Sequence, residues 1–132
     1  MKSRFFVVTA LSCLLASFAL PSQAADRVRP GQWETTLTFM GQTVTRSACM
    51  TQADADAING DAASIKAYID KASQPAGCNV TDVKISGNQV IVTSKCGAGA
   101  PTVGTTTYHG DSTETVTTNG TNSHAKYVGP CQ

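Results

Sequence analysis

Four cysteines are the residues whose chemistry the sequence indicates most directly. Cys49, Cys78, Cys96 and Cys131 all lie downstream of the apolar N-terminus. An even number of cysteines in a short exported chain is typical of disulfide bonds. No two of them have the close spacing at which paired cysteines bind zinc. We therefore expect two disulfides and no metal.

Two histidines and one aspartate form a second group that chemistry could use. His109 and Asp111 flank Gly110, so on a strand their side chains would share a face, and His124 could approach from the last strand. Such a group could bind a metal or transfer protons. A polar turn around Gly110 accounts for the same residues more simply, because no further ligand lies nearby. We predict no catalytic residue here.

Other catalytic and cofactor motifs are missing from the sequence. There is no Gly-x-Ser-x-Gly nucleophile motif, and a thiol nucleophile is excluded if all four cysteines pair. The glycine-rich stretch at residues 97–100 lacks the Lys-Ser/Thr ending of a phosphate-binding loop and is expected to be a flexible loop. The sequence thus predicts no cofactor and does not predict an enzyme.

Two patterns could form binding surfaces without catalysis. Trp33 could be an exposed aromatic platform, but its alternation with Leu37 and Phe39 favours a place in the core. The threonine rows within 105–107 and 113–117 could present a flat array of hydroxyl groups of the ice-binding kind. Threonine is common in half-wet antiparallel sheets, so a structural role is the simpler interpretation.

The N-terminus has the three parts of a secretory signal peptide. Lys2 and Arg4 precede an apolar run at residues 5–20, and small residues follow Pro21. The run is shorter than the roughly 20 residues of a membrane-spanning helix. We predict cleavage between Ala24 and Ala25, so that residues 1–24 are a signal peptide and residues 25–132 form one domain in the periplasm or outside the cell.

The composition of the predicted mature chain excludes several partners. Removing two basic residues with the signal leaves eight of the ten Lys/Arg against nine Asp/Glu, a net charge of about −1. No basic patch for nucleic acid and no further membrane span is expected. The mature chain has the length of a single domain that benefits from disulfides.

Alternating apolar residues and turn signals predict about seven strands. The clearest hairpin has a Gly87-Asn88 turn, which places Ile85 opposite Val90 and Val83 opposite Val92. The expected strands cover residues 33–39, 43–48, 79–86, 89–96, 104–109, 112–118 and 121–128. We expect a buried face made of Trp33, Leu37, Val83, Ile85, Val90 and Val92.

Residues 51–73 have the period of a helix instead. Apolar residues recur at three- and four-residue intervals, Asp61 can cap the helix, and Pro75 ends it. Ile65 and Ile69 are expected to pack on the sheet. The predicted fold is α+β and mostly β: a single antiparallel, half-barrel-like sheet of about seven strands, with one or two helices inserted after the second strand.

The same hairpin register predicts how the cysteines pair. Without a bulge, Cys96 opposes Asn79, so Cys78 and Cys96 point to opposite faces. Cys49 ends the second strand and Cys78 begins the third, and these ends meet if the two strands are neighbours. We therefore predict Cys49–Cys78 and Cys96–Cys131. The main alternative, Cys78–Cys96 with Cys49–Cys131, needs a bulge near the hairpin mouth.

The order of several short motifs resembles a known family. These motifs are Pro-Gly-Gln-Trp-Glu at residues 30–34, Cys49-Met50-Thr51, the hairpin bounded by Cys78 and Cys96, and the ending at residues 129–131. The chain resembles a bacterial family known as domain of unknown function 3617. The resemblance covers nearly all of the predicted mature chain and implies an exported, periplasmic protein of Gram-negative bacteria. It implies no activity.

Three functions remain open from the sequence. The first is a non-enzymatic binding or interaction module of the cell envelope, which holds a small ligand on the concave side of the sheet or an envelope protein at its edge. The second is an inhibitor of an envelope-targeting hydrolase such as lysozyme, acting through a protruding loop at residues 97–103. The third is a small hydrolase that uses His109 and Asp111. A deep pocket favours the first.

Overall fold

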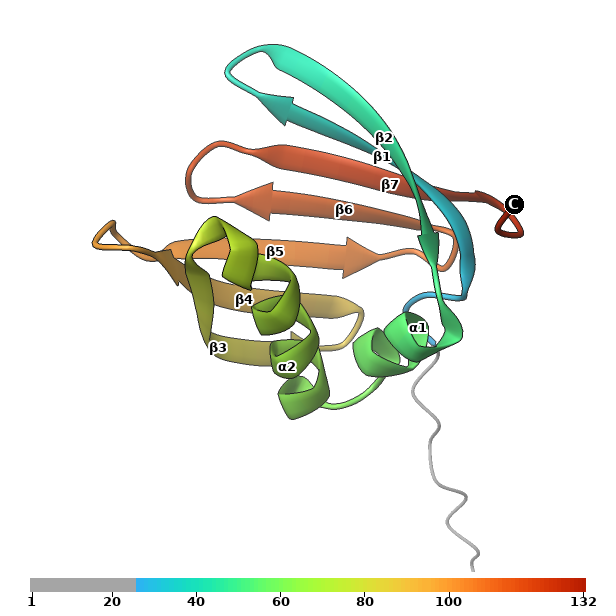
Figure 1. The fold of residues 1–132 in the computed structure, drawn as a ribbon, viewed down its shortest axis with the longest axis horizontal. Helices are drawn as coiled ribbons and strands as arrows, with labels where there is room; N and C mark the ends of the chain where they lie inside the picture. Colours follow the sequence, from blue (N-terminus) through green and yellow to red (C-terminus); the bar gives the residue numbers. More distant parts are fainter. Residues whose placement is uncertain (1–25) are drawn as a thin grey trace, which may run out of the picture.

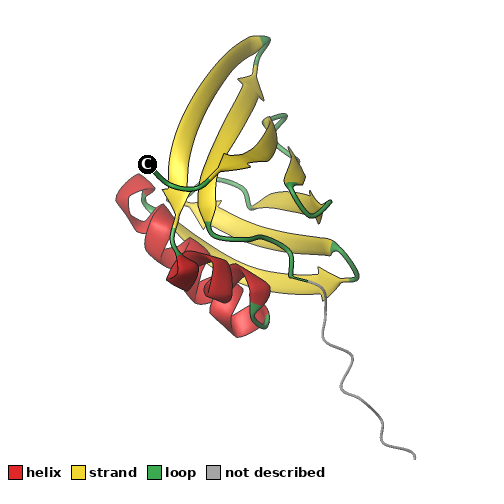
Figure 2. Ribbon diagram, turned by 90° about the vertical axis from the view of Figure 1, so that its right-hand side faces the viewer, coloured by secondary structure: helices red, strands yellow, loops and turns green. Residues whose placement is uncertain are grey.

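Seven antiparallel strands form one open sheet, with two helices on one side of it (Figures 1 and 2). The computed structural model describes residues 26–132, so the predicted signal peptide and the cleavage site between Ala24 and Ala25 lie outside the described residues. The elements are β1 (Gly31–Phe39), β2 (Gln42–Met50), α1 (Gln52–Asn59), α2 (Ala62–Ser73), a 3-10 turn (Gln74–Ala76), β3 (Cys78–Ser86), β4 (Gln89–Cys96), β5 (Thr102–Tyr108), β6 (Ser112–Thr117) and β7 (Asn122–Gly129).

The predicted fold class is confirmed: the protein is α+β and mostly β, with a single sheet. The strand order is β2-β1-β7-β6-β5-β4-β3, so the last strand lies beside the first. β2 and β3, which follow one another among the strands, form the two opposite edges of the sheet. The helical segment between them therefore passes across one face of the sheet (Figure 1). No helix of residues 26–132 is long and apolar enough to cross a membrane.

Both helices start at side chains that accept hydrogen bonds from the first turn. Thr51 and Asp54 form a reciprocal capping box at the start of α1. Asp61 caps α2, as the sequence predicts, by accepting a hydrogen bond from the Ser64 amide at 2.8 Å. These hydrogen bonds lower the pKa of both carboxyl groups in the folded protein. The caps divide the helical segment at Gly60.

The Pro-Gly-Gln-Trp-Glu motif has a structural explanation at the start of β1. Gly31 has a φ of +139°, and a Cβ atom there would overlap the ring of Tyr127. The Arg29 guanidinium lies over the Tyr127 ring, 3.7 Å from its centroid. The Trp33 indole nitrogen donates a hydrogen bond to the Arg29 carbonyl at 3.0 Å. The motif thus joins the first strand to the last.

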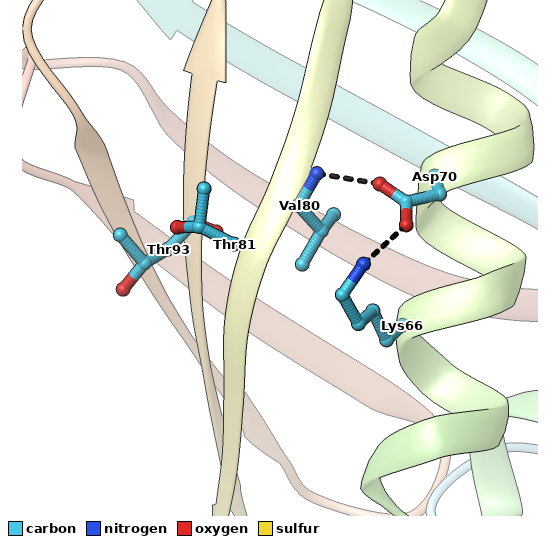
Figure 3. Close-up of polar contacts among 5 residues, drawn as sticks. All are labelled: Lys66, Asp70, Val80, Thr81 and Thr93. Carbon is cyan, nitrogen blue, oxygen red and sulfur yellow. Dashed lines mark hydrogen bonds and ion pairs between the residues drawn. The ribbon is translucent and has the colours of Figure 1, made fainter.

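One extra residue in β3 sets the register of the β3–β4 hairpin. Asp82 pairs with Thr93, but the next pair is Val80 with Ser94, which leaves Thr81 without a partner of its own. The Thr81 hydroxyl donates a hydrogen bond to the Thr93 carbonyl at 3.2 Å, and Figure 3 shows the two residues on adjacent strands. This arrangement is a β-bulge, and it shifts every pair beyond it by one residue.

The predicted disulfide pairing, Cys49–Cys78 with Cys96–Cys131, is wrong. The structure pairs Cys78 with Cys96 and Cys49 with Cys131, at Cα–Cα distances of 4.0 and 5.4 Å. The bulge places Cys78 directly opposite Cys96. Cys49 and Cys78 lie on opposite edge strands, six strand spacings or roughly 29 Å apart along the sheet, so they cannot meet. The prediction failed because it assumed that β2 and β3 are neighbours.

The buried core is smaller than the sequence predicts. Trp33, Val90 and Ile65 are buried as expected. Leu37 and Ile85 are not: their exposed fractions are 36% and 38%. Both lie on the same face as Trp33 but near hairpin ends, where the short helices do not cover the sheet. Alternation therefore identified the face correctly but not how far the helices extend over it.

Candidate functional site

The helix-side face of the sheet contains a cavity of about 140 Å³ that is partly open to solvent. Side chains from five adjacent strands, β2, β1, β7, β6 and β5, form its floor, and α1 covers it. Most of the lining is apolar or aromatic, and three threonines supply hydroxyl groups. The lining residues are Val28, Trp33, Thr35, Met50, Ile58, Thr106, Tyr108, Thr113 and Ala125.

Trp33 is both a core residue and part of the cavity wall. Only 4% of its surface is exposed. Its ring packs edge-to-face on Tyr127, with centroids 6.0 Å apart and an interplanar angle of 74°. Its indole nitrogen is already bonded to the Arg29 carbonyl. The ring is therefore held in one orientation, so it offers a ligand a fixed apolar surface and not a hydrogen-bond donor.

The segment before β1 is bound to the end of α1 and helps to enclose the cavity. The Asn59 side chain accepts hydrogen bonds from the amides of Arg27 and Val28 at 2.8 and 3.0 Å, and it donates one to the Val28 carbonyl at 2.8 Å. The Arg27 guanidinium donates to the carbonyls of Ile58 and Gly60 at the same helix end. These contacts fix the helix that covers the cavity.

Tyr108 is the only titratable side chain among the cavity residues that the structure describes. Burial raises the pKa of its phenol above the ordinary value, so the group is neutral and protonated at physiological pH. The threonine hydroxyls do not ionise either. The cavity can therefore hold an apolar group and hydrogen-bond to a polar one, but its lining offers no general base and no activated nucleophile.

A second hollow, of about 300 Å³, lies on the opposite face of the sheet and is more polar. Glu114 on β6 pairs with His124 on β7 across the strands, and both line this hollow. His109 Nε2 lies 4.0 Å from Glu114 Oε2. The two histidines are thus near one carboxylate, Glu114, which the sequence analysis did not single out.

The predicted grouping of His109 with Asp111 is not formed. Asp111 instead makes an ion pair with Arg29 at 2.8 Å, while His109 faces Glu114. All of these side chains are largely exposed. Among residues 26–132 no group of three or more His, Cys, Asp or Glu side chains is placed to hold a metal ion. The turn around Gly110 is therefore a polar surface turn, the interpretation that the sequence favours.

Most of the cavity residues escaped the sequence analysis. The sequence places Trp33 in an alternating strand and Met50 in the Cys49-Met50-Thr51 motif, whereas Ile58 and Tyr108 fall only within a predicted helix and a predicted strand. Each comes from a different element, so no spacing along the chain connects them. One signal for the cavity residues is present in the sequence: Thr106 and Tyr108 alternate along a strand, and they lie on the face that also carries Val90. That signal becomes useful only once the strand order is known.

Comparison with known proteins gives one result. A family model described as "Protein of unknown function (DUF3617)" matches residues 28–131, which is most of the chain and nearly all of its described part. No curated protein and no solved structure matches the chain significantly. The matched range includes the Pro-Gly-Gln-Trp-Glu motif, all four disulfide cysteines and every residue that lines the cavity.

Proposed function

The chain belongs to the family of proteins of unknown function DUF3617, and we propose that it is a non-enzymatic binding module of the cell envelope that holds a small apolar ligand in the cavity beside α1. The observation that carries this proposal is the cavity itself. It combines a fixed aromatic wall, Trp33, with apolar side chains from the sheet and from α1, and it is partly open. Ligand sites are typically concave, mostly apolar and largely pre-formed.

The volume of the cavity limits the ligand. A volume of about 140 Å³ is close to that of an apolar cavity of roughly 150 Å³ that binds benzene. It is smaller than most drug-sized sites, which start at about 300 Å³. The enclosed part of the ligand is therefore no larger than a small ring or a short alkyl segment.

An exported location is part of the proposal. Two disulfides in a chain with one small core are typical of an oxidising compartment. The apolar N-terminus with its predicted cleavage site at Ala24 and Ala25 supports the same location. Mass spectrometry of the protein secreted from a bacterial host tests this directly. Ala25 as the first residue supports export, and a mature protein that retains residues 5–20 contradicts it.

The fluorescence of Trp33 tests ligand binding. Trp33 is the single tryptophan of the chain, and it lines the cavity. A neutral, bromine-labelled short alcohol should quench it saturably, since a bromine atom quenches only at short range. Ala125→Leu places a larger side chain in the cavity and should abolish saturable quenching. Ala67→Leu, on the exposed side of α2, is the matched control and should leave it unchanged.

Two results would contradict the binding proposal. One is quenching that rises linearly with probe concentration in the wild type, because that indicates collisions in solution and not a site. The other is saturable quenching that survives Ala125→Leu, because the probe would then bind elsewhere. Circular dichroism of both variants confirms that they are folded before the titrations are compared.

A second function, inhibition of an envelope-targeting hydrolase such as lysozyme, is favoured by one observation. The residues of the loop between β4 and β5, 97–101, are all exposed, and the loop projects beyond the sheet in Figure 1. The Cys78–Cys96 disulfide ties its base. A lysozyme activity assay with added protein tests this function. Inhibition that Ala98→Trp removes and Ala53→Trp on α1 retains would support it, and unchanged lysozyme activity would reject it.

A further inference from the structure

Arg46 lies beside the cavity on the helix-side face of the sheet. It pairs directly with Thr35 across the β1–β2 ladder, and Thr35 lines the cavity. Opposed residues of antiparallel strands have their Cβ atoms about 5 Å apart and point to the same face. Arg46 is exposed, and no described side chain forms an ion pair with it. A free cation therefore adjoins an apolar cavity.

The charge on this face of the sheet is distributed unusually. By the pairing of the strands, Arg46 is the one charged residue among the described strand residues on the helix side. The opposite face carries charges of both signs, including Glu34, Lys126 and Glu114. Arg27, outside the strands, also lies near the cavity, but its guanidinium is bound to the carbonyls of Ile58 and Gly60. Arg46 is therefore the cation of the sheet that is left for a ligand with one anionic group and an apolar body.

The strand spacing sets the length of such a ligand. The cavity floor extends from Met50 at the end of β2 through β1, β7 and β6 to β5, and Arg46 lies on β2, four residues before Met50. Adjacent strands are about 4.8 Å apart, so the middle of the cavity, over β7, lies roughly 10 Å from the backbone of β2. An extended chain of about eight carbons covers this distance with the help of the arginine side chain.

We infer that the cavity binds a medium-chain fatty acid, with its carboxylate on Arg46 and the end of its alkyl chain against Trp33. This inference rests on the proposed function of the cavity. A guanidinium group binds a carboxylate with two parallel hydrogen bonds, which suits it to this headgroup. The alkyl end fills the apolar volume next to Met50 and Ile58, and no covalent step is involved.

Two brominated probes that differ only in the headgroup test the inference. ω-Bromooctanoate carries a carboxylate and ω-bromooctanol a neutral hydroxyl, and each places its bromine at the chain end that should lie near Trp33. At neutral pH and low ionic strength we expect the carboxylate to bind roughly tenfold more tightly than the alcohol. Raising the ionic strength should reduce this preference, because Arg46 is exposed to solvent.

The matched variants are Arg46→Gln and Lys84→Gln. Both remove one positive charge from a strand, but Lys84 lies on the opposite face of the sheet, where it forms an ion pair with Asp82 at 3.6 Å. Arg46→Gln should lower the carboxylate affinity to that of the alcohol and leave the alcohol affinity unchanged. Lys84→Gln should keep the preference.

The outcomes separate this inference from the proposed function. If both probes bind wild-type protein equally, or if Arg46→Gln retains the preference for the carboxylate, the fatty-acid inference is overturned while the apolar cavity remains a binding site. If neither probe quenches Trp33 saturably, the proposed function fails as well. If the carboxylate binds tightly but does not quench Trp33, the headgroup binds without the chain entering the cavity, and the inference is again overturned.

Discussion

The carboxylate of Asp70 on α2 accepts a hydrogen bond from the backbone amide of Val80 on β3, at 2.5 Å. The other oxygen of the same carboxylate accepts one from the Lys66 ammonium at 2.6 Å (Figure 3). Val80 directly precedes the bulge residue Thr81. One helical side chain therefore binds the strand where its register changes, and that register determines which cysteines meet.

Asp70→Asn should lower the stability of the protein relative to wild type at neutral pH. At acidic pH the difference between the two proteins should be smaller. The Lys66 ammonium and the Val80 amide lower the pKa of Asp70 in the folded protein. A carboxyl whose pKa is lower in the folded than in the unfolded state, where it is roughly 3.9, stabilises the fold above that pH. This stabilisation disappears as the pH falls through the folded pKa.

Urea denaturation at neutral pH and near pH 3 measures this difference. Wild type should exceed Asp70→Asn in stability at neutral pH, and the gap should narrow on acidification. Asp26→Asn is the control, since Asp26 is exposed and its side chain forms no hydrogen bond within the described residues. An unchanged gap at both pH values would show that the Asp70 charge does not stabilise the fold.

The two disulfides should contribute unequally to stability. Cys49–Cys131 spans 82 residues and Cys78–Cys96 spans 18. In the chain-entropy treatment these loops correspond to about 4.5 and about 3.2 kcal/mol. The double variant Cys49→Ser/Cys131→Ser should therefore unfold at lower denaturant concentration than Cys78→Ser/Cys96→Ser. Non-reducing peptide mapping of wild type checks the pairing first, and a peptide linking Cys49 to Cys78 would contradict the structure.

The sequence predicted local structure better than long-range topology. The Gly87-Asn88 turn, the Asp61 cap and the β3–β4 register near Ile85 all depend on residues close together in the chain, and the structure confirms them. The edge positions of β2 and β3 depend on where the helical segment crosses the sheet, which no nearby residue specifies. The disulfide prediction failed at that step and at the bulge.

The bulge has no strong signal in the sequence. Thr81 is an ordinary strand residue by its propensity, and the Asp70 carboxylate that binds the neighbouring Val80 amide comes from another element. The alternative pairing of Cys78 with Cys96 required such a bulge, so the sequence contained the correct possibility without the means to select it. The cavity also lacks a signal in the sequence, because its lining comes from elements that only the fold brings together.

Gly31→Ala should destabilise the protein more than Gly129→Ala. Both glycines have a φ of +139°, which strains any residue with a Cβ atom. A Cβ at Gly31 would also overlap the Tyr127 ring, whereas one at Gly129 would meet no atom within 4 Å. Strain alone should cost about 1–3 kcal/mol in each variant, and displacing Tyr127 adds to the cost for Gly31. Because a Cβ at Gly31 would also meet the Gly129 carbonyl oxygen, equal losses in chemical denaturation would mean that both the Tyr127 ring and the Gly129 backbone move aside freely.

Val90→Ala should cost more stability than Ile85→Ala, although isoleucine is the larger residue. The two residues face each other across the β3–β4 hairpin, but Ile85 lies on the edge strand β3, whereas Val90 lies between Ile85 and Thr106. Val90 is 1% exposed and Ile85 is 38% exposed. Truncating Val90 should cost about 2–3 kcal/mol, because it leaves a cavity that the fixed surroundings cannot fill. Truncating Ile85 should cost about 1–1.5 kcal/mol, because water replaces the lost carbons. Urea denaturation of both variants measures the two losses, and a larger loss for Ile85→Ala would show that the helices cover the sheet farther than the structure places them.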